Sequence, residues 1–490
     1  MRQGETMAAA SGRTRVQNTG LLLGVIAFAA ALLTEPPAGM SVAGWQVAGT
    51  MALMAVWWGT EALPFAATAL VPLAVLPPLG AASAADLAQG YGNTTLYLIL
   101  GGFLLGLAME RCNLHRRIAY AIVARASGNA QGLVFGMMCA TGFVSLWVQN
   151  TSTTLMMLPV ALSVATIVAP DTAAGDRDAK NFASAIILCV AYAANIGGLG
   201  TLVGTAPNAM VAGFMQQNYG ETISFAQWLA FGIPTVLLLM PVAWLVLVKL
   251  VFPFRLGSQT IARDRLIEAR AALGPMLVAE RRVTAVFVLT AAAWVTGPLL
   301  RQLPGLSEFN DTTIALFAGF ALFLIPNGTK EGGGLLVGAD LQRLPWEVLL
   351  LFGGGLALAE AIQGSGLSAF MGEALAGIGT WPLLALVAAV VTLIVLWTEL
   401  NSNMATVATF MPILAAIAAA SNYPVLQLAA PAALAATCGF MLPVGTPPNA
   451  IVFGTGRLSM RDMIRAGWRV NMAAIVIVTA VSMLVIPLIA

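Results

Sequence analysis

The sequence has little charge and almost no histidine. Of its 490 residues, 59% are hydrophobic and only 9% are charged, whereas soluble proteins carry about 25% charged residues. This excess of apolar residues argues against a soluble enzyme. The net charge of +2, without a basic stripe or an acidic tail, argues against a nucleic-acid partner. The single histidine, His115, rules out most histidine-ligated metal sites and most histidine-based catalysis.

Cysteine is also scarce, and its spacing carries no chemistry. The four cysteines stand singly in apolar runs at Cys112, Cys139, Cys189 and Cys438. Without a CxxC spacing, neither a zinc site nor a disulfide framework is predicted. The sequence implies no organic cofactor, and the spans contain no paired nucleophile and base that would suggest an intramembrane enzyme.

Long apolar runs are abundant. A hydrocarbon core of about 30 Å needs about 20 apolar residues per helix, and about eleven runs approach that length. They lie near 19–34, 44–63, 64–80, 93–112, 183–215, 229–253, 281–300, 311–326, 345–363, 425–455 and 467–489. The first run follows a polar segment with three arginines and lacks a recognisable cleavage pattern, so we expect it to be retained.

Two further apolar blocks, about 132–168 and 381–420, are too long for one helix and contain central polar clusters. Each block could form two short spans or a re-entrant hairpin. If the N-terminus is cytoplasmic and both blocks are hairpins, every Lys and Arg except Arg301 falls on the cytoplasmic side, as the positive-inside rule demands. The sequence therefore predicts an all-α polytopic protein of the cell (inner) membrane, with about eleven spans, two hairpins and an external C-terminus.

The two halves of the chain resemble each other at three places. The matched segments are Gly101-Gly102-Phe103-Leu104 with Gly353-Gly354-Gly355-Leu356, Asn150 and Pro159 with Asn403 and Pro412, and Gly204-Thr205-Ala206-Pro207-Asn208-Ala209 with Gly445-Thr446-Pro447-Pro448-Asn449-Ala450. The first hairpin enters from inside and the second from outside, so the repeats are inverted. Inverted repeats with broken helices are typical of secondary transporters.

Four polar segments are the candidate site. Two are the hairpin tips, 145–154 and 398–404, and two are the helix breaks, 197–208 and 439–449. Because backbone in lipid must satisfy its own hydrogen bonds, such segments should line a protein-walled cavity. Freed carbonyls, hydroxyls and Asn oxygens suit Na⁺, while helix N-termini attract an anion. Together they predict a cation-coupled anion site that needs no Lys or Arg.

Two further titratable residues are Glu399, which has two possible roles, and His115, for which we expect a structural role. Glu399, near the second tip, either accepts backbone N–H bonds or takes a proton. His115 stands at the start of an amphipathic interfacial helix predicted over 114–127, where we expect it to anchor the membrane surface. A second cytoplasmic surface helix is predicted over 258–275.

The sequence resembles the divalent anion/sodium symporters, the INDY-like dicarboxylate transporters, along nearly its whole length. The resemblance rests on the tips and on Trp57-Trp58-Gly59-Thr60-Glu61-Ala62-Leu63-Pro64, Leu100-Gly101-Gly102-Phe103-Leu104, Asn113-Leu114-His115-Arg116-Arg117 and Gly445-Thr446-Pro447-Pro448-Asn449-Ala450. It implies a homodimer in the lipid bilayer, with a fixed scaffold and a mobile transport domain that works as an elevator. The scaffold would comprise residues 1–131 and 257–380, and the transport domain residues 132–256 and 381–490.

The resemblance also implies residue roles. The first sodium site would use Ser145, Gln149, Asn150 and Gly204, and the second would use Thr398, Asn401, Asn403 and Gly445. The anion would meet Asn150, Thr151, Thr205, Ser402, Asn403 and Thr446, with Gln149, Met404 and Pro447 beside them. Gln149 and Met404 depart from the Ser-Asn-Thr pattern of the family's tips. Met404 has no hydroxyl, so the anion loses a hydrogen bond of about 1–3 kcal/mol there.

The predicted function is Na⁺-coupled import of a divalent organic anion such as succinate, malate or fumarate. Because the two departures make the site asymmetric, a sodium-independent exchanger and a carrier of sulfate or another small anion stay open. An anion channel is a remote alternative, since its selectivity would call for rings of charge that the sequence does not show.

Overall fold

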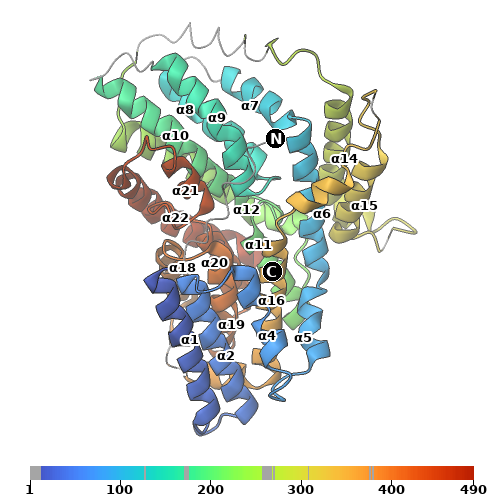
Figure 1. The fold of residues 1–490 in the computed structure, drawn as a ribbon, viewed down its shortest axis with the longest axis vertical. Coiled ribbons are helices and arrows are strands. Elements are labelled where there is room, and N and C mark those ends of the chain that lie inside the picture. The colour runs from blue at the N-terminus through green and yellow to red at the C-terminus, as the bar shows by residue number, and fades with distance from the viewer. Residues whose placement is uncertain are drawn as a thin grey trace.

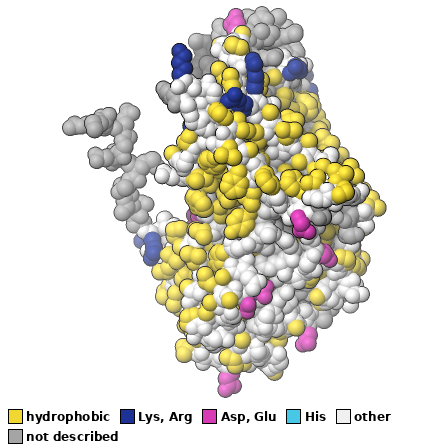
Figure 2. Space-filling model, turned by 90° about the vertical axis from the view of Figure 1, so that its right-hand side faces the viewer, with side chains coloured by type: hydrophobic (Ala, Val, Ile, Leu, Met, Phe, Trp, Pro, Cys, Tyr) yellow, Lys and Arg dark blue, Asp and Glu magenta, His cyan; other side chains and the backbone are white. Residues whose placement is uncertain are grey.

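The computed structural model describes residues 13–125, 129–169, 176–256, 268, 271–306, 308–330, 332–374, 377 and 380–489. In these residues the regular secondary structure is helical, apart from an isolated bridge between Pro326 and Gly334. Nine helical stretches of the described chain are long and apolar enough to cross a membrane. Figure 2 shows side chains of the apolar class spread across the middle of one face. The predicted all-α polytopic fold is confirmed.

The order of helices in the N-terminal half is repeated in the C-terminal half. The first half contains α1 (Arg15–Leu33), α2 (Val42–Thr60), α3 (Phe65–Ala69), α4 (Val71–Val75), α5 (Ala84–Tyr91), α6 (Thr94–Arg111), α7 (Leu114–Arg125), α8 (Ala130–Ser145), α9 (Asn150–Val168), α10 (Arg177–Gly198), α11 (Ala206–Tyr219), α12 (Phe225–Leu245) and η1 (Val246–Val251). The second half contains α14 (Val278–Leu300), α15 (Asp311–Leu324), η2 (Gly338–Arg343), α16 (Trp346–Gly364), α17 (Leu367–Ala374), α18 (Leu383–Thr398), α19 (Asn403–Ser421), α20 (Leu426–Ala436), α21 (Pro447–Phe453) and α22 (Met460–Ile489). The series α6 to α12 thus corresponds to α16 to α22.

Both long apolar blocks are helical hairpins, as predicted. Helices α8 and α9 meet at a tip of four residues, 146–149, and α18 and α19 meet at 399–402. The second arm of each hairpin starts at its paired asparagine, Asn150 or Asn403.

Both predicted helix breaks are present. Residues 199–205 separate α10 from α11, and residues 437–446 separate α20 from α21. The chain resumes its helix at proline in each case, with Pro207 in the first turn of α11 and Pro447 at the start of α21. Proline is tolerated there because the first N–H groups of a helix have no intrahelical acceptor.

One predicted span is absent as a continuous helix, and one predicted surface helix falls mostly outside the described residues. The run near 64–80 is not a continuous helix but the two five-residue helices α3 and α4 followed by turns. Pro64, Pro72 and Pro77 each remove a backbone donor within this stretch, which prevents one long helix. Most of the surface helix predicted over 258–275 lies outside the described residues.

Helix α10 is buried along most of its length, whereas α1 lies at the periphery of the molecule. Every residue of α10 from Ala185 to Gly198 is fully buried. Helix α1 packs against α2 and leaves most of its surface exposed (Figure 1). The C-terminal part of α10 is apolar on all sides apart from Asn195, as expected of a helix inside a protein, and it leads directly into the first break.

The matched glycine motifs are sites of close helix packing. A Cβ on Gly101 of α6 would stand 2.6 Å from the carbonyl oxygen of Ala315 on α15. A Cβ on Gly354 of α16 would collide with the backbone of Ala69 in α3. These glycines therefore hold the helices around the site rather than forming the site.

Ion pairs join α6 and α7 to neighbouring elements at one end of the molecule. Arg117 forms a bidentate pair with the buried Glu280 of α14, at 3.1 and 3.0 Å. Arg111 pairs with Asp340 of η2, and Arg343 pairs with Glu110. On the face shown in Figure 2, the Lys and Arg side chains gather mainly at the upper end.

Helix α7 confirms a helix at the predicted place, but His115 does not lie on its surface. The imidazole is only 4% exposed, and its Nδ1 lies 3.4 Å from the carbonyl oxygen of Met109. Burial lowers the pKa of His115. The predicted anchoring role is therefore wrong, because the side chain turns towards α6 instead of outwards.

Candidate substrate and cation site

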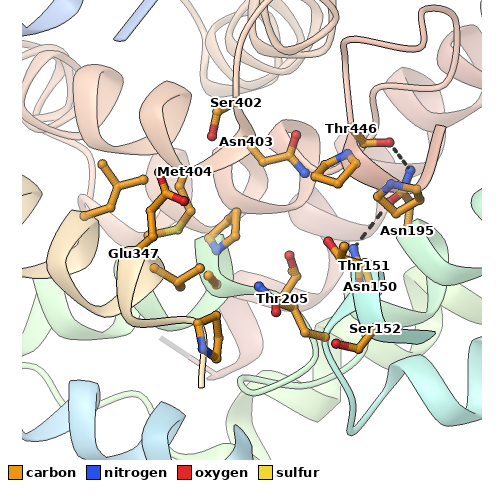
Figure 3. A pocket seen from close by; sticks show the side chains of 18 of the residues that line it. Asn150, Thr151, Ser152, Asn195, Thr205, Glu347, Ser402, Asn403, Met404 and Thr446 are labelled. Carbon is orange, nitrogen blue, oxygen red and sulfur yellow. Dashed lines mark hydrogen bonds between the residues drawn. The ribbon is translucent and has the colours of Figure 1, made fainter. Parts of the chain in front are cut away.

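The two hairpin tips and the two helix breaks surround one cavity of about 960 Å³ (Figure 3). All the residues expected to meet the anion line this cavity: Gln149, Asn150, Thr151, Thr205, Ser402, Asn403, Met404, Thr446 and Pro447. They come from segments some 250 residues apart, which the repeat brings together.

Four helix N-termini begin at the cavity wall, those of α9, α11, α19 and α21. At three of them the capping residue, Gln149, Thr205 or Ser402, makes no side-chain hydrogen bond to the first turn. The first N–H groups of a helix lack intrahelical partners, and the helix dipole adds positive potential there. The wall is therefore suited to an anion even where it carries no basic side chain.

The first tip contains a cluster of four oxygen atoms. The Oδ1 of Asn150 lies 3.0 Å from Ser145 Oγ, 3.1 Å from the Ala194 carbonyl oxygen and 3.2 Å from the Gly204 carbonyl oxygen. Ser145 Oγ in turn donates to the Ala194 carbonyl at 2.7 Å. Asn150 Oδ1 and the two carbonyls are all acceptors, so the cluster is satisfied either by an amide turned to present its NH₂ or by a cation.

The second tip repeats this cluster atom for atom. The Oδ1 of Asn403 lies 3.1 Å from Thr398 Oγ1, 3.0 Å from the Ala436 carbonyl oxygen and 3.2 Å from the Gly445 carbonyl oxygen. Thr398 Oγ1 donates to the Ala436 carbonyl at 2.7 Å. Two independent segments of sequence thus build the same arrangement of oxygens.

Each cluster sits where helices end. Helices α8 and α10 end at the first cluster, and α18 and α20 end at the second, so the negative poles of their dipoles face it. The described residues contain no group of three His, Cys, Asp or Glu that could hold a metal. Neutral oxygens beside helix C-termini fit a monovalent cation such as Na⁺.

Gln149 and Asn401, which were expected to be sodium ligands, do not belong to the two oxygen clusters. Both lie in the tips, yet within the described chain neither side chain is hydrogen-bonded to the oxygen clusters. Asn401 Oδ1 is buried and has no hydrogen-bond partner there. The structure therefore gathers Ser145, Asn150 and Gly204 at one cluster and Thr398, Asn403 and Gly445 at the other.

Asn195 is a polar residue of the site that sequence analysis missed. It is fully buried on α10, where its Nδ2 donates to Thr446 Oγ1 at 2.9 Å and its Oδ1 accepts from Asn150 Nδ2 at 3.4 Å (Figure 3). It therefore connects a tip of the first repeat with the break of the second. The signal in the sequence was a lone amide inside an apolar helix, two residues before a glycine pair.

Glu399 supports the second break, which is one of its two predicted roles. Its carboxylate accepts from the backbone N–H groups of Phe440 (2.7 Å), Met441 (2.8 Å) and Leu442 (2.8 Å). The side-chain amide of Asn471 on α22 donates to it as well, at 2.7 Å. Four donors around one carboxylate stabilise its charged form and hold the unwound backbone in place.

Four charged side chains also line the cavity. Glu61, Glu110, Arg343 and Glu347 line it, and Arg343 pairs with Glu110. Glu347 lies beside Met404 (Figure 3). Among the described residues of the cavity wall, Arg343 is the basic one, and it comes from η2 rather than from a tip or a break.

Comparison with known proteins agrees with this geometry. The family model of the sodium:sulfate symporter transmembrane region matches residues 15–490. The sodium-dependent dicarboxylate transporter SdcS of Staphylococcus saprophyticus is 41% identical over 96% of this chain and 92% of that protein. The Staphylococcus aureus protein of the same name is 39% identical over the same shares.

Solved structures share the fold at low sequence identity. The YdaH transporter of Alcanivorax borkumensis covers 80% of this chain and 86% of its own at 16% identity, with a TM-score of 0.53. MtrF of Neisseria gonorrhoeae covers 97% and 96% at 11% identity, with a TM-score of 0.57. Likenesses at this level concern the fold alone, whereas the family match extends over the hairpins, the breaks and the last helix. The chain therefore belongs to the sodium:sulfate symporter family, the divalent anion/sodium symporters that its motifs resemble.

Proposed function

We propose that this protein imports C4-dicarboxylates such as succinate, malate or fumarate, together with Na⁺. Its family and relatives are transporters, so it is a carrier rather than an enzyme. The relatives named as sodium-dependent dicarboxylate transporters support both the substrate class and the coupling ion. The observation that carries the proposal is the pair of matching oxygen clusters, each set directly behind helix N-termini that face one cavity.

In this proposal the anion lies between the two tips. Its carboxylates accept from first-turn N–H groups and from the side chains of Asn150, Thr151, Thr205, Ser402, Asn403 and Thr446, with Gln149, Met404 and Pro447 completing the wall. One Na⁺ at each oxygen cluster offsets the charge of a dianion, which explains how a wall of neutral side chains can hold it. Because opposite charges bind close together, each ion raises the affinity for the other.

We further propose an elevator cycle. The tips and breaks all belong to residues 132–256 and 381–490, the mobile part, whereas Glu61, Glu110 and Glu347 come from the scaffold, residues 1–131 and 257–380. A cavity with one wall from each part can be carried across the membrane when the mobile part slides. The proposed assembly is a homodimer, as in the family.

The membrane orientation is part of the same proposal. Arg111, Arg117 and Arg343 cluster at the end of the molecule where α6 finishes, and Arg343 and Glu110 of this end also line the cavity. With this end cytoplasmic by the positive-inside rule, the N-terminus is inside and the C-terminus is outside. The protein is a multi-pass membrane protein, which we assign to the cell membrane.

Uptake of radiolabelled succinate into proteoliposomes tests the function. Three conditions are compared: an inward Na⁺ gradient, K⁺ in place of Na⁺, and vesicles preloaded with succinate. Uptake that needs the Na⁺ gradient is the expected result. Uptake only after preloading would identify an exchanger, and uptake of sulfate but not succinate would overturn the dicarboxylate assignment.

A further inference from the structure

Asn195 lies between a cation cluster and the anion wall and touches both. It is fully buried, and its amide spans from Asn150, whose Oδ1 belongs to the first oxygen cluster, to Thr446, whose hydroxyl lines the cavity. The side-chain amide of Asn195 thus links the first repeat to Thr446, a residue of the second repeat that lines the cavity.

With the Asn195 amide in this orientation, its hydrogen bond sets the direction of the Thr446 hydroxyl. Its oxygen accepts from Asn195 Nδ2 at 2.9 Å and from the backbone N–H of Asn449 at 3.4 Å. A hydroxyl has two acceptor positions and one proton, so both acceptor positions are in use. No group of the described chain accepts the remaining proton. Because Thr446 lines the cavity, this proton is available to an anion there.

Whether the Thr446 proton can face the cavity depends on whether a cation occupies the first oxygen cluster. With a cation bound, Asn150 Oδ1 must face it, which leaves Asn150 Nδ2 to donate to Asn195 Oδ1. Without a cation, the favourable orientation of Asn150 is reversed, because its NH₂ then donates to the carbonyls of Ala194 and Gly204. Its oxygen would in that case face Asn195 Oδ1, and two acceptors cannot pair.

We propose that Asn195 is a positioning residue that transmits cation occupancy at Ser145, Asn150 and Gly204 to the anion-binding hydroxyl of Thr446. When the first cluster is empty, both amides turn over. Asn195 then presents its oxygen to Thr446, whose proton points inwards, away from the cavity. When Na⁺ binds, the amides of Asn150 and Asn195 turn back, and the hydroxyl proton of Thr446 faces the anion. The inference rests on the proposed function and adds to it the path by which one ion prepares the site for the other.

The second repeat lacks this connection. In the two oxygen clusters the Ala436 carbonyl takes the place of the Ala194 carbonyl, so the counterpart of Asn195 is Thr437, whose buried hydroxyl has no hydrogen-bond partner in the described chain. The counterpart of Thr446 is Thr205, which makes no side-chain hydrogen bond to the first turn of its helix. The relay is therefore a property of one cation site only, and the two sites are expected to differ in their coupling to the anion.

A double-mutant cycle on the purified full-length protein tests the relay. The variants are Asn195→Ala, Thr446→Val and the pair together. The control is Thr479→Ala, which removes a buried hydroxyl without a described partner on α22, away from the tips and breaks. The half-saturating concentrations of succinate and, in parallel, of sulfate are measured by radioligand binding at saturating Na⁺. The rise in melting temperature that Na⁺ causes without anion is measured separately. If Asn195→Ala is not monodisperse, Asn195→Leu, which fills a similar volume, replaces it.

We expect Asn195→Ala to raise the half-saturating anion concentration about tenfold, the loss of one well-placed hydrogen bond, while Na⁺ alone still stabilises the protein. In the Thr446→Val background, Asn195→Ala should raise the half-saturating anion concentration by less than about twofold further, because the two residues act through one hydroxyl. Thr479→Ala should behave like the wild type.

Three results would overturn the relay: an unchanged anion affinity in Asn195→Ala, an equal loss in both backgrounds, or loss of the stabilisation by Na⁺ alone. The last would make Asn195 a structural part of the cation site. A wild type that binds sulfate but not succinate overturns the proposed substrate and leaves the cycle readable with sulfate. A wild type that binds neither anion in Na⁺ overturns both the proposed function and the relay.

Discussion

Asn449 holds the second helix break in the way that Asn208 holds the first. The Nδ2 of Asn208 donates to the carbonyl oxygens of Gly198 at 2.9 Å and Thr201 at 2.8 Å, which lie ten and seven residues before it. The Nδ2 of Asn449 donates to carbonyl oxygens at the same two separations, both at 3.0 Å. Both asparagines are fully buried. One amide thus replaces the hydrogen bonds that each unwound segment has lost.

Removing this amide should destabilise the protein. In Asn449→Ala two buried carbonyls lose a donor, each at a cost of about 1–3 kcal/mol. We expect a clear fall in the melting temperature of the purified protein, and the same for Asn208→Ala. Asn181→Ala is the matched control, since Asn181 also donates to a carbonyl, that of Pro253, but at an exposed position where water can replace it. Equal melting temperatures for Asn449→Ala and the control would show that the amide is dispensable.

Gly204→Ala should disable the first cation cluster. A Cβ there would stand 2.7 Å from the Gly198 carbonyl oxygen and 2.9 Å from that of Ser145. Relieving this overlap moves the Gly204 carbonyl out of the cluster, and overpacking of this kind costs about 1–3 kcal/mol. We expect the half-saturating Na⁺ concentration for uptake to rise about tenfold or more.

The control for Gly204→Ala is Gly364→Ala near the end of α16. No atom lies within 4 Å of a Cβ at Gly364. This change should leave the Na⁺ dependence alone and stabilise the helix by up to about 1 kcal/mol. If both variants keep the wild-type Na⁺ dependence, the Gly204 carbonyl is not a ligand of the coupling ion.

Glu399→Gln separates a structural carboxylate from a proton carrier. Gln would present an NH₂ group to donors that the carboxylate now accepts from, namely the backbone N–H groups of Phe440 to Leu442 and the amide of Asn471. Hydrogen bonds to a charged group contribute about 1.5–3 kcal/mol each, so we expect uptake to fall strongly at every pH between about 5.5 and 8.5. Retained uptake with a flattened pH profile would instead mean that Glu399 carries a proton.

Met404→Thr should tighten anion binding. The internal repeat pairs Met404 with Thr151, and only the threonine offers a hydroxyl to the cavity. Supplying the missing donor should lower the half-saturating succinate concentration by about five- to tenfold, equivalent to about 1–1.4 kcal/mol. Thr151→Met should shift it in the opposite direction. An increase in the half-saturating concentration with Met404→Thr would indicate that the methionine suits a substrate with one apolar end.

Much of the architecture was already determined by the sequence. Length and hydropathy set the all-helical membrane fold, because every backbone group in lipid must find a partner within its own helix. The matched motifs around Asn150 and Asn403, and around Gly204 and Gly445, indicated hairpins and breaks, since repeated glycine, proline and asparagine interrupt helices in a recognisable way. The run near 64–80 was misjudged because its many Ala, Val and Leu residues keep the mean hydropathy high even though the prolines between them break the helix.

Only the tertiary structure decided which atoms meet. Sequence spacing shows that Asn150 and Thr446 belong to polar segments, but the bond between them through Asn195 depends on how α10 passes the break of the other repeat. The same holds for Glu399, whose two possible roles differ only in what surrounds its carboxylate, and for His115, which turns inwards. A hydropathy pattern records how much of each segment is apolar. Hydrogen bonds act over about 3 Å, so their partners are fixed only when the helices have packed.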